Sequence, residues 1–139
     1  MQFVRHDNSY VLRFEDGELF PDRFLEFLAA EEIRGGGFTG IGAMQWTRIA
    51  FFDIESKKYL DRQLDEQFEV LALVGNVAMH DARPVVHAHI TLGRADYSVL
   101  GGHLVQGAVR PTLEVVLHTT PEPLIREIDL KYGLPTLQL

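Results

Sequence analysis

The segment from Val85 to Gly93 alternates between two kinds of side chain, and this alternation constrains the fold more than any other feature of the chain. Every second residue is apolar, at Val86, Ala88, Ile90 and Leu92. Successive side chains of a β-strand point to opposite faces, so we expect a strand that packs this apolar face on the core. His87 and His89 then lie side by side on the opposite face.

A third imidazole follows in the sequence Gly101-Gly102-His103-Leu104. A hairpin turn near Ala95 and Asp96 would bring His103 opposite His89. Three neutral imidazoles and a water form an open tetrahedral site for zinc. His87 and His89 also fit a pair of exposed or interface histidines without a metal, because no compact signature such as His-Glu-x-x-His is present. The paired glycines equally fit a simple turn or bulge.

The rest of the chain predicts a sheet with one principal helix over about residues 21–32, which opens at Pro21 and Asp22. Phe68 to Val77 is almost entirely apolar and is expected to be a central strand buried on both faces, with a bulge or bend at Gly75-Asn76. Residues 79–84 are expected to form a loop. Further strands are expected around residues 10–14, 38–52, 59–64, 113–119 and 125–130, and the apolar tail 132–139 is expected to dock on its own sheet or on a neighbouring subunit.

Composition excludes several classes of function. The chain has 139 residues, no cysteine and a formal net charge of −7. The absence of cysteine excludes disulfides, thiolate catalysis and cysteine zinc sites. Because phosphate binding depends on Lys and Arg, the acidic charge argues against nucleic acid as a direct ligand. No apolar run approaches the roughly 18–20 residues that span a bilayer, and no apolar leader is visible, so we expect a cytoplasmic protein without membrane contact.

The sequence singles out no catalytic residue. None of the three serines lies in a Gly-x-Ser-x-Gly motif, which argues against a serine hydrolase. A zinc-bound water would be assisted by a general base. Glu66, Glu69 and Glu114 are the candidates, and each also fits an ordinary strand-edge or surface acid.

The histidine motifs carry a resemblance to a known family. His-x-His-x-x-x-Gly at 87–93 and Gly-Gly-His-Leu-x-x-Gly at 101–107 resemble the signature of the PPC domain (plants and prokaryotes conserved). The glycine-rich segment 34–43, the apolar segment 68–77 and the segment 112–117 are similar to further parts of that domain. The likeness runs in order through nearly the whole chain.

The resemblance implies a fold and a site more than a reaction. It implies one compact α+β domain over residues 1–139, built on mainly antiparallel sheet, and a homotrimer. It implies a divalent metal, with zinc the first choice, held by His87, His89 and His103. Plant relatives bind DNA through a separate segment centred on Arg-Gly-Arg-Pro, which this chain lacks.

Three functions are therefore open at this point. The first is a homotrimeric metal-binding protein of unknown activity, in which the metal binds a small ligand or organises the fold. The second is a zinc-dependent enzyme that acts on a small molecule. The third is a protein-interaction module without catalysis.

Overall fold

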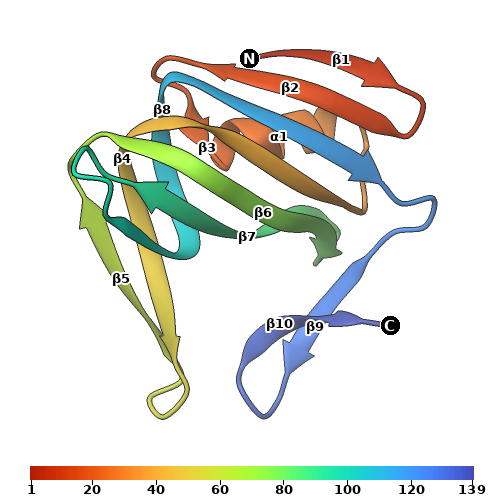
Figure 1. The fold of residues 1–139 in the computed structure, drawn as a ribbon. Helices are drawn as coiled ribbons and strands as arrows, with labels where there is room; N and C mark the ends of the chain where they lie inside the picture. The colour runs from red at the N-terminus through yellow and green to blue at the C-terminus, as the bar shows by residue number, and fades with distance from the viewer.

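Two long antiparallel strands run through the molecule, and five other strands pair directly with one of them. The computed structural model describes residues 1–139. Strand β4 (Gly36–Asp53) pairs with β8 (Val99–Thr119) from Gly36 opposite Thr119 to Ala50 opposite His103. Three irregularities in register interrupt this ladder, and such irregularities bend a strand and increase its twist. The two strands can therefore carry one sheet around the core (Figure 1).

The remaining strands extend this pair on both sides. Strand β6 lies along the first half of β4, β5 along its second half, and β7 between β6 and the start of β8. All pairings are antiparallel except a single parallel pair between β6 and β9. The strand bounds are β1 (Gln2–His6), β2 (Ser9–Glu15), β3 (Leu19–Phe20), β5 (Lys58–Leu64), β6 (Phe68–His80), β7 (Arg83–Gly93), β9 (Ile125–Asp129) and β10 (Leu134–Gln138).

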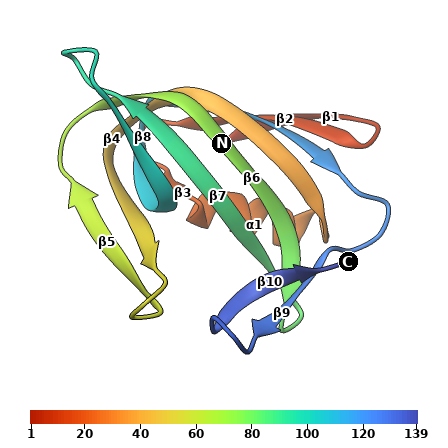
Figure 2. The same ribbon diagram turned by 60° about the horizontal axis from the view of Figure 1, so that its bottom comes forward.

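Helix α1 (Asp22–Ala30) lies against the concave side of the bent sheet (Figure 2). Its buried residues are Phe24, Phe27 and Leu28, which join a core of 23 buried side chains. The helix is shorter than the expected 21–32, because its last turn closes at Glu31 and Glu32 adopts a left-handed φ of 54°. The fold is rich in β-sheet and has one short helix, which agrees in broad terms with the expected α+β class. No helix is long and apolar enough to cross a membrane.

Strand β6 corrects the expectation of a strand buried on both faces. Leu71 and Val74 are 50% and 55% exposed, whereas Val70, Leu73 and Val77 are buried. The alternation shows that only one face of β6 packs on the core, since α1 covers one side of the sheet alone. The apolar run in the sequence therefore includes an uncovered apolar face, which the sequence cannot distinguish from a buried one.

The segment 79–84 is also not the expected loop. Strands β6 and β7 pair up to His80 opposite Arg83, and the chain reverses at Asp81 and Ala82, both with positive φ. Two consecutive left-handed residues are the geometry of a tight hairpin turn. Gly75 and Asn76 lie within the longer strand β6, as expected, but they form no bulge, and the irregularity of register lies between Val70 and Ala72 instead.

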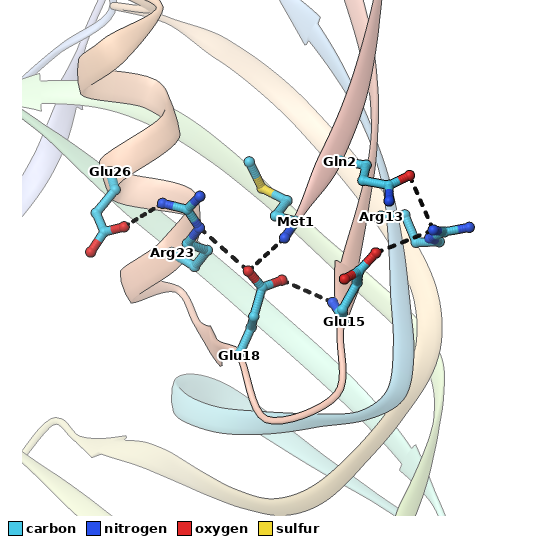
Figure 3. Close-up of polar contacts among 7 residues, drawn as sticks. All are labelled: Met1, Gln2, Arg13, Glu15, Glu18, Arg23 and Glu26. Atoms are coloured by element: carbon cyan, nitrogen blue, oxygen red, sulfur yellow. Dashed lines mark hydrogen bonds and ion pairs between the residues drawn. The ribbon is translucent and has the colours of Figure 1, made fainter.

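A carboxylate ties the start of β1 to the helix. Glu18 accepts a hydrogen bond from the Met1 amino group at 2.6 Å and one from the Glu15 backbone N–H at 2.8 Å, and Arg23 lies 3.4 Å away (Figure 3). Burial raises the pKa of the Glu18 carboxyl, but the hydrogen bonds from Met1 and Glu15 and the nearby charges lower it overall. These contacts fix the first hairpin against α1.

Gly75 is expected to be intolerant of a side chain. A Cβ at this position would lie 2.5 Å from the ring of Phe38 and 2.5 Å from the carbonyl oxygen of His87. We predict that Gly75→Ala lowers the free energy of unfolding by about 1–3 kcal/mol through overpacking. Gly37→Ala is the matched control, because its nearest neighbour would be 3.9 Å away, and its effect should stay within about 0.5 kcal/mol. Urea unfolding measures both, and equal losses would contradict the prediction.

Candidate metal centre

The hairpin of β7 and β8 brings the three histidines together. The strands pair from His89 opposite His103 to Gly93 opposite Val99. The connection at 94–98 is closed by Ser98, whose backbone N–H and hydroxyl both donate to Asp96. The expected turn near Ala95 and Asp96 is thus confirmed. Directly paired residues share a face of the sheet, so His103 lies beside His89 and His87.

The apolar face of β7 packs as the alternation predicts. Ala88, Ile90 and Leu92 are buried, and Val86 packs against the core. Gly101 stands within β8 rather than in a turn. A Cβ there would lie 2.5 Å from the carbonyl oxygen of Ile90, so glycine allows β8 to approach β7 closely.

The three imidazoles converge at the surface. One ring nitrogen from each of His87, His89 and His103 lies within 4.8 Å of the others. The ring centroids are 5.2 to 5.7 Å apart. His89 is exposed, and the other two are half-buried. The cluster is therefore accessible to solvent on the side of His89.

The surroundings keep two of these rings neutral. Burial, with smaller effects from the other two histidines, lowers the pKa of His103 to about 4. Burial also lowers the pKa of His87, followed by the charge of Arg126 and by His89. The ring of Tyr59 lies against His103, with centroids 4.8 Å apart. Neutral imidazole is the form that binds a metal, so the local electrostatics suit a metal ligand.

The donor set fits a divalent transition metal. Three imidazoles are a common ligand set for zinc and leave a fourth position open. The buried Nδ1 of His103 has no hydrogen-bond partner. A buried polar atom without a partner is costly, and coordination of a metal at Nδ1 would compensate for it. When bound, such a metal polarises a water or a ligand oxygen at the open position.

Sequence reasoning missed Arg126, which is buried beside the cluster. It lies on β9, almost forty residues after His87, and its Nη2 is 3.3 Å from the Nδ1 of His87. The same Nη2 donates to Asn76 at 2.8 Å, and Nη1 donates to the carbonyl oxygen of Pro135 at 2.7 Å. Nothing in the sequence around Arg126 resembles a site motif, and only the docking of β9 beside β6 reveals its place.

The acids considered as general bases are not near the cluster. Glu66 is exposed and accepts hydrogen bonds from Arg94, and Glu69 and Glu114 lie on exposed positions of β6 and β8. None of them lines the cavity beside His87 and His103. The structure therefore gives a zinc-dependent reaction no carboxylate base among the residues proposed for it.

Comparisons with known proteins place this fold in a family. The structure superposes on the metal-containing protein from Archaeoglobus fulgidus with a TM-score of 0.88 and 33% identity, covering 99% of this chain and 97% of the other. A PPC protein from Pyrococcus horikoshii gives 0.88 and 32%, with 99% and 94% covered. A protein from Bacteroides thetaiotaomicron, provisionally described as DNA-binding, gives 0.95 and 28%, with 99% and 96% covered.

Sequence comparison adds one curated relative and a family model. The bifunctional protein GlmU from a Synechococcus strain is 31% identical over 116 residues, which are 81% of this chain and only 17% of that protein. The chain thus spans less than a fifth of that curated relative. The family model of the Plants and Prokaryotes Conserved domain matches residues 1–121. By its sequence over these residues, the chain belongs to the Plants and Prokaryotes Conserved domain family.

Proposed function

We propose that this chain forms a homotrimer, and that each chain binds one divalent metal, zinc or a close relative, through His87, His89 and His103. The observation that carries the proposal is the convergence of three ring nitrogens within 4.8 Å on paired strands. The description of the Archaeoglobus relative as metal-containing supports it. We also propose that residues 1–139 form one domain, with β9 and β10 as its extension beyond the family model. No chemical reaction is assigned.

Assembly of several copies of the chain is supported by an uncovered apolar row across the outer face of the sheet. The ladder pairs Val4 with Val11, Val11 with Val116, Val116 with Thr39 and Thr39 with Val74. Directly paired residues share one face, and the four valines of this row are exposed. Contiguous exposed apolar side chains are typical of protein contacts. The apolar tail gives no such support, because it forms β10 against β9 of the same chain.

Duplex DNA is not the ligand that we propose, although two of the structural relatives carry a provisional DNA-binding description. The net charge of −7 opposes phosphate binding, and the chain has no Arg-Gly-Arg-Pro segment. The cavity beside the histidine cluster has Arg126 as the one Lys or Arg residue in its lining. The proposed ligand is therefore small, and the proposed partners are two further copies of the chain.

Removal of one imidazole tests the metal site. We predict that zinc titrates the wild-type protein at one ion per chain at pH 7.5, and that His103→Ala lowers the affinity by about 100-fold or more. Loss of a direct ligand should exceed the 10–100-fold typical of an outer-shell change. His118→Ala is the control, because His118 is exposed on β8 away from the cluster, and calorimetry compares the three proteins. Equal zinc affinity in His103→Ala and the wild type would overturn the site.

The metal-free protein should lose stability in acid. Because the pKa of His103 falls to about 4 in the fold and the unfolded value is near 6.5, the unfolded chain binds more protons between these values. The free energy of unfolding in the presence of a chelator should therefore fall as the pH is lowered from about 6.5 toward 4. His103→Gln should flatten this dependence and His118→Gln should not. Urea unfolding across this range is the measurement, and an unchanged slope in His103→Gln would refute the assignment.

A change in the apolar row tests the assembly. Light scattering of the wild-type protein should give about three times the 15.8 kDa chain mass. Val74→Lys and Val116→Lys should each shift the mass toward one chain, because a charge within an apolar contact is costly to bury. Leu130→Lys, in the exposed connection of β9 and β10, should leave the mass unchanged. A wild-type mass near one or two chains would exclude the homotrimer.

A further inference from the structure

Arg126 is a buried cation without an acidic partner. Its residue is only 8% exposed, and its Nε makes no hydrogen bond. Its other contacts are the neutral acceptors on Asn76, Pro135 and His87, and none of the chain's ion pairs includes it. A buried charge is costly unless it is paired. The geometry therefore leaves a buried positive charge at this point, with which an external anion would form an ion pair.

A cavity adjoins this guanidinium and the histidine cluster. Its volume is about 310 Å³, enough for a small molecule. His87, His103 and Arg126 form one part of its wall, and Val85, Val86 and Leu134 form an apolar part. No carboxylate lines it. A molecule that fits this lining carries one anionic group and a short apolar portion.

The contact of Arg126 with His87 is incompatible with a metal on His87. A guanidinium can only donate hydrogen bonds, so the Nδ1 of His87 must accept, and a neutral ring then carries its proton on Nε2. A metal bound at Nε2 requires the proton on Nδ1, which can no longer accept. A metal bound at Nδ1 occupies the lone pair itself. With a neutral His87, either mode of coordination releases Nη2 of Arg126 from this ring.

The released atom completes a pair of donors. Nε and Nη2 lie along one edge of a guanidinium, and such an edge matches the two oxygens of a carboxylate. Asn76 still accepts from Nη2, which has two hydrogens, and Pro135 still holds Nη1. The metal-loaded protein would thus keep Arg126 in place and leave the edge formed by Nε and Nη2 free for a carboxylate.

We propose that Arg126 binds the carboxylate of a small monocarboxylic acid whose apolar part occupies this cavity, and that metal binding at the histidines strengthens the binding. The inference rests on the proposed metal function and adds the ligand class and its coupling to the metal. By linkage, the acid must raise the metal affinity by the same factor by which the metal raises the affinity for the acid.

The first experiment uses the unmodified protein and a matched pair of probes. Butyrate and butyramide have similar shapes, and only butyrate is charged. Butyrate should bind the zinc-loaded protein at least about 5-fold more tightly than the metal-free protein. This factor is the lower limit of typical coupling between two sites. Butyramide should bind both forms weakly and equally. Ligand-detected NMR at constant ionic strength gives the four affinities, and zinc calorimetry with and without butyrate checks the reciprocal effect.

The second experiment removes the guanidinium. Arg126→Met should keep zinc binding and abolish the preference for butyrate over butyramide, and Arg126→Lys should recover only part of it, because lysine lacks the fork. Arg13→Met, at an exposed site on β2, is the control and should behave as the wild type. Thermal unfolding of each variant shows whether the C-terminal hairpin still folds. If a variant loses the hairpin, the comparison of butyrate with butyramide on the wild-type protein tests the proposal.

The outcomes separate the two proposals. Normal zinc binding without a preference for butyrate overturns the carboxylate site alone. A zinc-dependent preference for butyrate that survives in Arg126→Met means that the metal itself binds the acid, and it overturns the role of Arg126. Failure of zinc to bind the wild type overturns the metal function and the coupling with it.

Discussion

The antiparallel ladder between β4 and β8 is the interaction on which the rest of the structure depends. These are the two longest strands, and β2, β3, β5, β6 and β7 each pair with one of them. The irregularities of register in this ladder bend the sheet over α1 and the aromatic core. The same ladder fixes His103 opposite Ala50, so the position of the third imidazole is set by the backbone and needs no metal. The histidine cluster is thus a product of backbone pairing, not of a flexible loop.

Rigid placement has an energetic side at the cluster. Burial disfavours the protonated form of His103, and the neighbouring charges of His87 and His89 lower its pKa further. The metal-free protein therefore holds groups that water would solvate better. A cation that accepted the three lone pairs would relieve this cost, and the stability of the fold would then be linked to the affinity of the proposed site.

The sequence was a good guide where local patterns decide the structure. Alternation predicted β7 and the shared face of His87 and His89, and the turn residues predicted the hairpin that brings His103 to them. The sequence was a poor guide where solvent exposure or distant packing decides. The apolar run of β6 does not reveal that Leu71 and Val74 face outward, and the short turn at Asp81 and Ala82 lacks the glycine that normally marks such a reversal. Arg126 reaches the cluster only through the docking of β9.

The attachment of the C-terminal hairpin has an evolutionary consequence. Strands β9 and β10 lie beyond the residues matched by the family model, and they meet the sheet through one ladder pair, the hydrogen bond of His80 and the side chain of Arg126. Few core residues constrain them. Substitutions within β9 and β10 can therefore change the part of the cavity wall that Arg126, Leu134 and Pro135 form, and leave unaltered the ladder that positions the three histidines. In evolution, such changes would alter which molecules fit beside the histidine cluster.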